Sequence, residues 1–495
     1  MAARPTAAQE RVDSVMVERI TREGLDRSQV IGLFNTLTNV IGPRLTGSPA
    51  YREAAEWARG RFEAWGLSGS RLEPFEFGRG WSLEHYTLEL VEPRYSPLIG
   101  YPEAWTPSTA GVVEGAPVYL GDKTAEEIRA MAGRLRGAIV LPVPPQTEFI
   151  TEDRPQPADH EERVRIGAPP FLRSEGRVPR RDLTGLLREV GAAAVVWPNQ
   201  GKDGTVFVLG RRDTPDDATP SIVLAGEHYN MLLRLGESDK PVRVRLELRT
   251  RYHEEDRNGY NVLAELPGTD PALRDEVVML GAHLDSWHAS TGATDNADGS
   301  AEAMEAMRIL KAVEARPRRT IRVALWGGEE QGLLGSRAWV ARMTEGRKDG
   351  TPEGVAGQPT DRQERLYVYL NDDPGTGPIY GWYLEENTAI QPIFDAWLAP
   401  FRPLGARKNV LDKIGSTDHL SFIAAGVPAF NTLKDYVDYD VRTHHTNADF
   451  FERVRERDLQ QSAIVLAAFA YHAAMRDGPL PAAATRPTIP EGDAR

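Results

Sequence analysis

The apolar residues in the second half of the chain follow two alternating periodicities. Short, nearly continuous apolar runs are typical of buried strands, and apolar residues spaced three or four positions apart are typical of helices. The runs that predict strands are residues 277–282, 320–326, 366–370 and 427–433, and those that predict helices are residues 301–313, 333–343 and 459–474. This alternation predicts an α/β fold with a mostly parallel, doubly wound sheet that is covered on both faces.

The first half of the chain has a different pattern. Ser48 and Pro49 precede apolar residues spaced three or four apart, which predicts a capped helix that ends at Gly66. Between residues 111 and 250, short apolar runs and strand-like alternation predict a compact, β-rich unit inserted into the larger domain. Within it, residues 151–181 are rich in Pro and charged side chains. They predict a long solvated loop, with a lid over an active site as the alternative.

The length of 495 residues is several times that of a typical domain, so we expect a large domain with a substantial insert. The expected division is the N-terminal part of the catalytic domain at residues 1–110, the insert at residues 111–250, the rest of the catalytic domain at residues 251–478 and a disordered tail at residues 479–495.

The composition excludes several classes of function. Lys and Arg number 59 against 72 Asp and Glu, and the net charge of −13 argues against nucleic acid or an anionic membrane as the main partner. Cysteine is absent, so any metal must be bound by His, Asp and Glu. We expect no membrane span, and residues 1–17 carry no apolar signal segment. A cytosolic chain and an exported chain whose signal has been removed both remain open.

Polar side chains follow the predicted strands. Because the site of an open parallel sheet lies at the carboxyl ends of its strands, we expect these side chains to lie together. His283 ends the first strand, and the carboxylate of Asp285 could accept a hydrogen bond from its ring. Glu329 and Glu330 follow the second strand. Adjacent carboxylates allow one to bind a metal while the other accepts a proton.

Three further segments add to this set. Asp295 lies at the start of a predicted helix, where it could cap the helix or, with its two oxygens, bridge two cations. The pairs at residues 372–373 and 444–445 offer another carboxylate and another imidazole. Together the segments contain enough nitrogen and oxygen ligands for two zinc ions with a position left open for water.

These residues resemble the M28 family of zinc peptidases, from about residue 30 to residue 475. The likeness is carried by residues 283–287, 292–296, 329–333, 373–376, 416–422 and 445–446. Within the family the chain is most similar to the carboxypeptidase Q-like branch, and it also resembles the aminopeptidases. The insert resembles the protease-associated (PA) domain that interrupts the catalytic domain in many members.

The resemblance implies a role for each candidate residue. The implied zinc ligands are His283 and Asp373 for one ion, Glu330 and His445 for the other, and Asp295 as the bridge between them. Glu329 would be the general base, and Asp285 would orient the ring of His283. His444 stands where some relatives have a Tyr that stabilises the tetrahedral intermediate, so it either donates that hydrogen bond or only packs. A cis peptide bond between Asp295 and Asn296 is also expected.

The predicted activity is hydrolysis of a peptide or related amide bond in small peptides by a di-zinc exopeptidase. Aminopeptidase, dipeptidase and carboxypeptidase action all stay open, because groups of both charges lie near the motifs. These groups are Asp418, Asp438, Arg407, Lys413, Lys434 and Arg442. The alternatives are hydrolysis of N-acyl amino acids, a transferase similar to glutaminyl cyclases, and a metal-free, receptor-like binding protein. The chain could also form a homodimer, since dimers are the commonest homo-oligomers.

Overall fold

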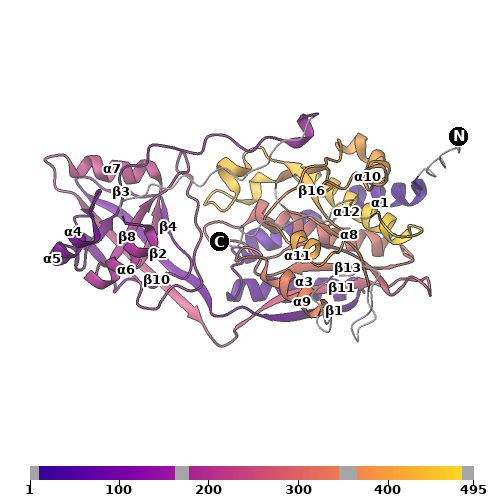
Figure 1. The fold of residues 1–495 in the computed structure, drawn as a ribbon, viewed down its shortest axis with the longest axis horizontal. Helices are drawn as coiled ribbons and strands as arrows, with labels where there is room; N and C mark the ends of the chain where they lie inside the picture. Colours follow the sequence, from indigo (N-terminus) through magenta and orange to yellow (C-terminus); the bar gives the residue numbers. More distant parts are fainter. Residues whose placement is uncertain (1–9, 162–177, 345–364, 374, 482–495) are drawn as a thin grey trace, which may run out of the picture.

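The computed structural model describes residues 10–161, 178–344, 365–373 and 375–481. The chain forms two lobes (Figure 1). The larger lobe is built on a seven-stranded sheet, and the smaller one on sheets of four and five strands.

The strands of the large sheet lie in an order that differs from their order in the chain. From edge to edge they are β1 (Ser68–Glu76), β11 (Asn258–Leu266), β13 (Thr320–Trp326), β12 (Glu276–His283), β14 (Arg365–Asn371), β16 (Ala429–Asp435) and β15 (Thr376–Tyr383). The neighbours β13, β12, β14 and β16 pair in parallel. β1, β11 and β15 join through antiparallel pairs. The sheet is therefore mixed rather than mostly parallel. The prediction was wrong on this point because the sequence pattern indicated the parallel strands and missed the antiparallel ones.

Helices cover both faces of this sheet, as the sequence predicted. One face carries α1 (Ser14–Asp26), α2 (Val30–Asn35), α3 (Pro49–Ala64), α8 (Asp298–Ala312), α10 (Gln391–Leu398) and α12 (Glu456–Met475), and the other carries α9 (Leu334–Thr344) and α11 (His419–Ala424). Alternate residues of β12 face the two layers: Val278 and Leu280 pack in the first core, and Val277 and Met279 in the second.

Short helical turns connect these elements. They are η1 (Thr36–Ile41), η3 (Ala293–Ala297), η4 (Ala399–Leu404), η5 (Tyr439–Thr443) and η6 (Phe451–Arg453). Helix α3 begins as its sequence predicted: the side chain of Ser48 accepts a hydrogen bond from the backbone N–H of Tyr51, and Pro49 occupies the first turn.

The smaller lobe has a core of its own. One sheet contains β3 (Ser96–Pro97), β2 (Gly80–Glu92), β10 (Arg243–His253) and β5 (Val113–Gly115). The other contains β4 (Gly100–Pro102), β9 (Ser221–Leu224), β8 (Ala194–Pro198), β7 (Ile139–Leu141) and β6 (Val118–Tyr119), with helices α4 (Ala125–Ala130), α5 (Ala132–Leu135), α6 (Arg180–Val190) and α7 (Gly226–Gly236) beside them. β2 pairs with β10 along its length, although it precedes the expected boundary at residue 111. We call residues 80–253 the inserted lobe; its likeness to a PA domain stays a prediction.

One segment of the inserted lobe reaches the larger lobe. Residues 150–161, which we call the arm, run across the gap between the lobes and include η2 (Pro157–Asp159) (Figure 1). Pro157 and Ala158 are buried, so the expectation of a solvated loop is wrong at this turn, whereas most of the other described residues of the arm are exposed or partly exposed. Residues 162–177 lie outside the described residues.

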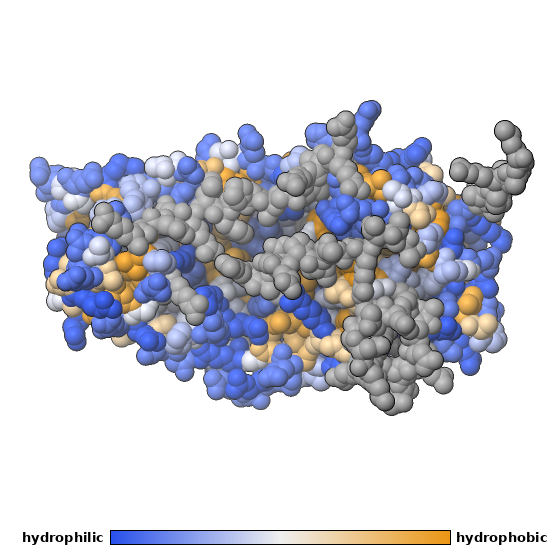
Figure 2. Space-filling view, in the orientation of Figure 1, coloured by the Kyte–Doolittle hydropathy of each residue, from blue (hydrophilic) through white to orange (hydrophobic). Residues whose placement is uncertain are grey.

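The face shown in Figure 2 is largely hydrophilic, with smaller apolar areas between the polar side chains. None of the described helices has both the length and the apolar character needed to cross a membrane. Of the predicted tail, Leu480 packs in the main core, and residues 482–495 lie outside the described part of the chain.

Candidate active site

The polar segments meet at one edge of the large sheet. His283 is the last residue of β12, Glu329 and Glu330 follow β13, and Asp373 follows β14. His445 lies just after η5, in the connection that follows β16. Because β13, β12, β14 and β16 are parallel neighbours, their carboxyl ends lie side by side, and the side chains gather there as the fold rule predicted.

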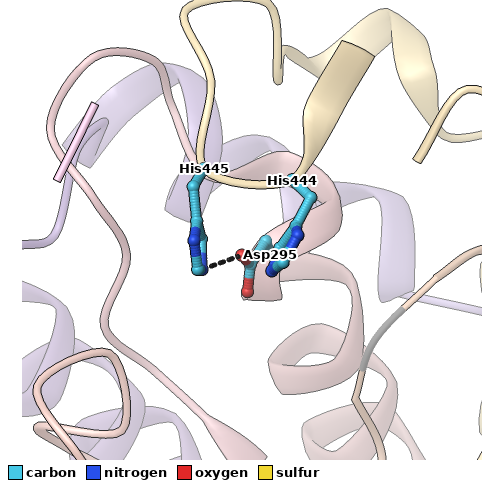
Figure 3. Close-up of side chains that lie close together, drawn as sticks. All are labelled: Asp295, His444 and His445. Carbon is cyan, nitrogen blue, oxygen red and sulfur yellow. Dashed lines mark ion pairs between the residues drawn. The ribbon is translucent and has the colours of Figure 1, made fainter. Parts of the chain in front are cut away.

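Asp295 lies at the centre of this group. Its Oδ1 is 3.1 Å from Nε2 of His283, and its Oδ2 is 3.1 Å from Nε2 of His445. In Figure 3, His444 and His445 descend from one loop toward the carboxylate of Asp295, which comes from the opposite side. The peptide bond between Asp295 and Asn296 is cis, as predicted. The two oxygens of one buried carboxylate thus face two different imidazoles.

The remaining carboxylates divide between the two imidazoles. Oε2 of Glu330 is 2.9 Å from Nε2 of His445. On the other side, Nε2 of His283 is 3.6 Å from Oδ1 of Asp373 and 4.0 Å from Oε2 of Glu329. Besides the shared Asp295, His445 therefore faces Glu330, and His283 faces both Asp373 and Glu329.

The ring of His283 is oriented by the main chain of Asp285. Nδ1 of His283 is 3.0 Å from the backbone carbonyl oxygen of Asp285, which can only accept, so Nδ1 donates and Nε2 is left to face the site. The carboxylate of Asp285 is farther away, with Oδ1 at 3.5 Å from Nδ1. That oxygen accepts a hydrogen bond from the backbone N–H of Glu329 instead. Asp285 thus positions both the imidazole and the glutamate.

Two residues that the sequence reasoning missed hold the loops of the site. The carboxylate of Asp449 accepts hydrogen bonds from the backbone N–H groups of Thr294 and Asp295, at 2.8 and 3.2 Å. The fully buried Arg44 donates to backbone carbonyls on both flanks of the site, including those of Leu284 and Gly292. Neither residue follows a predicted strand, and no local pattern distinguishes them from ordinary surface charges.

The adjacent aspartates at residues 372 and 373 have different surroundings. Asp373 faces His283, whereas Oδ1 of Asp372 accepts a hydrogen bond from Thr432 and lies 3.2 Å from Nζ of Lys434. Lys434 also pairs with the buried carboxylates of Asp298 and Glu302, so neither Asp298 nor Asp372 faces the imidazoles. Burial opposes the charge of Lys434, but these three carboxylates outweigh it and raise its pKa.

The charges of the site are those of a cation-binding centre. Burial opposes protonation of His445, yet Glu330 and Asp295 outweigh it and raise the pKa of His445 to about 10. Burial and the charge of Asp295 raise the pKa of Glu330 to about 7. The raised pKa of His445 reflects the excess of carboxylates around it, and a bound metal would displace a proton from such a ring.

The donor set fits a metal. His283, Asp295 and Glu330 each offer a ligand atom within 4.8 Å of the others, and so do Asp295, His444 and His445. Nε2 of His283 and Oε1 of Glu330 are buried without a hydrogen bond among the described residues. Buried polar atoms are normally satisfied, and imidazole nitrogens with carboxylate oxygens are the zinc ligands open to a chain without cysteine.

His444 packs between two rings. Its ring stacks on that of Tyr439, with 5.0 Å between the ring centroids, and contacts the ring of His445, with 3.9 Å between the centroids. Burial and the nearby His445 lower the pKa of His444 to about 3, so the ring is neutral at neutral pH. A neutral imidazole carries one N–H and can donate one hydrogen bond into the site.

The side chains that could bind a substrate terminus are mostly engaged. Asp418 is buried near the metal-ligand candidates, and burial raises its pKa to about 7. Asp438 is exposed at the rim, 3.9 Å from Arg453. The basic candidates all have anionic partners: Arg407 with Asp159, Lys413 with Glu386, Lys434 with three buried carboxylates, and Arg442 with Asp203.

The fold is a mixed sheet covered by helices, and imidazoles and carboxylates gather at its strand ends. This combination indicates a metal-dependent hydrolase. Residues 261–470 match the profile of Peptidase family M28, so the chain contains a domain of this family and the resemblance seen in the sequence is confirmed. The matched region includes every metal-ligand candidate.

The chain is homologous to carboxypeptidase Q. It is 23% identical to the human protein over 451 residues, which cover 90% of this chain and 85% of the relative. Among solved structures it is similar to a peptidase M28 precursor from Shewanella amazonensis SB2B, with a TM-score of 0.68, 24% identity and coverage of 95% and 98% of the two chains. It is also similar to a zinc aminopeptidase from Bacillus subtilis, with a TM-score of 0.59, 18% identity and coverage of 90% and 95%.

Proposed function

We propose that this chain is a zinc-dependent exopeptidase that holds two zinc ions at the strand ends of its large sheet. The observation that carries the proposal is the position of Asp295, whose two oxygens each lie 3.1 Å from a different imidazole. His283 and Asp373 would hold one ion, Glu330 and His445 the other, and Asp295 would bridge them. The homology to carboxypeptidase Q and to zinc aminopeptidases supports metallo-exopeptidase function.

The chain's own residues account for the proton transfers. Bound zinc would polarise the scissile carbonyl and make water nucleophilic near neutral pH. Glu329 is not needed as a ligand in this scheme and lies beside the site, so it would take the proton of the attacking water and pass it to the leaving amine. His444, neutral and stacked, would donate a hydrogen bond to the oxyanion that forms in the transition state.

The charges around the site favour recognition of a free amine. A substrate carboxylate needs a cationic partner, preferably an Arg. Arg407, Lys413, Lys434 and Arg442 each have an anionic partner within the protein. The relatives include both polarities, since the human one is named a carboxypeptidase and the Bacillus one an aminopeptidase. On the charge pattern we propose aminopeptidase action on small peptides.

The test is a panel of short peptides with free, N-acetylated or C-amidated ends, incubated with zinc-loaded protein with and without chelator and read by mass spectrometry. Chelator-sensitive cleavage that N-acetylation blocks is expected. Cleavage blocked by C-amidation alone would indicate a carboxypeptidase instead, and a need for both free ends would indicate a dipeptidase. Release of an acyl group would favour hydrolysis of N-acyl amino acids, and formation of pyroglutamyl peptides would favour the cyclase-like transferase. The absence of any reaction would favour the receptor-like binding protein.

The metal count has its own measurement. Elemental analysis of the protein after dialysis against buffered zinc is expected to give two zinc ions per chain. One ion per chain would contradict the bridging role of Asp295.

Light scattering coupled to gel filtration tests the proposed homodimer.

A further inference from the structure

The loop that carries His445 is held by the inserted lobe. The backbone N–H of Val208 donates to the carbonyl oxygen of His445 at 2.9 Å, and the N–H of Asn447 donates to the carbonyl oxygen of Val206 at 3.1 Å. The side chain of Asn447 accepts a hydrogen bond from Val206 N at 2.7 Å. A strand-like contact of the inserted lobe thus lies against the backbone of a proposed zinc ligand, more than 200 residues away in sequence.

The arm binds the same loop at the start of η5, on the other side of the two histidines. Arg154 makes three hydrogen bonds to the carboxylate of Asp440, from its backbone N–H and from Nε at 2.8 Å and from Nη2 at 2.5 Å. The side chain of Asp440 is fully buried and that of Arg154 is 7% exposed. The carboxylate of Asp153 accepts from the backbone N–H groups of Asp438 and Val441, at 2.8 and 3.0 Å.

The arm also has an apolar anchor. Ala158 packs in a cluster of buried residues from the larger lobe, which includes Tyr436 and Tyr439. The guanidinium of Arg154 lies over the rings of Tyr436 and Tyr439, at 4.9 and 5.5 Å from their centroids. Buried, paired and stacked groups of this kind hold a segment in one position.

From Arg154 a chain of direct contacts leads to the proposed metal ligand. Tyr439, under the guanidinium, stacks on His444, and the ring of His444 contacts that of His445. Asp440, which Arg154 binds, lies two residues after Asp438 and is the second residue of η5, the turn that presents both histidines. A shift of the arm would therefore move the turn from which His445 reaches Asp295 and Glu330.

We infer that Arg154 is a positioning residue for the metal site formed by Glu330 and His445, and that docking of the inserted lobe and metal binding at this site are coupled. This inference rests on the proposed function. The coupling is reciprocal: an arm that favours the bound geometry of His445 strengthens metal binding, and a bound metal stabilises the docked arm by the same free energy.

The first test compares Arg154→Gln with wild type in a zinc titration against a competing chelator, with cobalt absorption as a spectroscopic probe of each site. The variant is expected to bind one equivalent as wild type does and the second about tenfold more weakly, a size within the usual range for coupling between linked sites. Arg154→Lys, which keeps the charge, should restore part of the affinity. Arg188→Gln, which removes an exposed ion pair within the inserted lobe, is the matched control and should titrate as wild type. Wild-type affinity for both equivalents in Arg154→Gln would overturn the inference.

Two measurements keep the test decisive if Arg154→Gln does not fold. The double variant Arg154→Gln/Asp440→Asn leaves neither buried charge unpaired and should show the same selective loss of affinity. In the unaltered protein, zinc should slow hydrogen exchange of the peptides that span residues 150–160, and unchanged exchange there would contradict the coupling. A wild-type protein that binds no zinc would instead refute the proposed function, so the two failures are distinct.

Discussion

Oε2 of Glu330 lies 2.9 Å from Nε2 of His445, while the preceding glutamate extends toward the other imidazole of the site. Successive residues after β13 therefore serve opposite sides of Asp295. The backbone of Glu329 is fixed in this arrangement by its hydrogen bond to Asp285. Two adjacent carboxylates with the same chemistry thus face different imidazoles, and the different roles that we propose for them can be tested by changing one at a time.

Glu329→Gln is expected to keep its zinc and lose turnover. The amide cannot accept the proton of the attacking water, and general base catalysis contributes about 10²–10⁴-fold. Glu330→Gln is the adjacent control: it should lose both turnover and zinc, because it removes a proposed carboxylate ligand of the ion that we assign to Glu330 and His445. Elemental analysis and kcat on a cleaved peptide are the two readouts. Substantial activity in Glu329→Gln would remove this residue from the role of base.

The sequence predicted the part of the site that depends on local pattern and on one fold rule. Each parallel strand was visible as an apolar run, and polar residues directly after such runs meet at one sheet edge. His283, Glu329 and Glu330 were found in this way. The antiparallel strands β1, β11 and β15 were missed, because they do not belong to the strand–helix alternation. The order of the strands in the sheet was not predicted either, because it depends on pairing between distant segments.

Residues whose function depends on distant partners could not be found. Arg44 and Asp449 act through backbone groups brought near them only by folding. The arm was interpreted as solvated because its composition is charged and rich in Pro. Two of its charges instead pair across the lobes: Arg154 with Asp440, 286 residues away, and Asp159 with Arg407. Composition reports that a charge exists but not whether it is paired.

Asp373 and Asp372 provide a matched pair of variants. Asp373→Asn should weaken binding of the zinc ion that we assign to Asp373 and His283, because an amide is a poorer ligand than a carboxylate. Asp372→Asn should retain both ions and cost about 1–3 kcal/mol of stability, since it weakens buried contacts with Thr432 and Lys434. Zinc titration and thermal unfolding separate the two. Equal zinc loss in both variants would contradict the ligand choice.

His445 and His444 form a second adjacent pair. His445→Phe should lose the zinc ion that we assign to His445 and Glu330, whereas His444→Phe should keep both proposed ions and the ring stack on Tyr439. If His444 donates a hydrogen bond to the oxyanion, its variant should lower kcat by about 10²–10³-fold, with little change in KM. A kcat equal to that of wild type would leave His444 as a packing residue. Zinc content and steady-state kinetics are the measurements.

The ion pair of Arg154 and Asp440 predicts a pH dependence of stability. Burial opposes ionisation of Asp440, but the hydrogen bonds and charge of Arg154 outweigh it and hold the pKa of Asp440 below its ordinary value of 3.8. The other titratable groups near Asp440 are Asp153, His444, Tyr436 and Tyr439. A carboxyl whose pKa is lower in the folded state stabilises the fold above its unfolded pKa, and this contribution is lost as the pH falls through the folded pKa.

Asp440→Asn should therefore lower the Tm at neutral pH, and the difference from wild type should shrink as the pH falls below about 4, where the unfolded carboxyl takes up its proton. Breaking a buried pair costs about 3–5 kcal/mol, because the partner charge stays buried. Asp217→Asn, which removes the exposed partner of Arg188, is the control and should change the Tm little at any pH, since exposed pairs contribute about 0–1 kcal/mol. Calorimetry of the three metal-free proteins between pH 3 and pH 8 makes the comparison. A Tm difference for Asp440→Asn that is as large at pH 3 as at pH 7 would show that the charge of this carboxylate does not hold the arm.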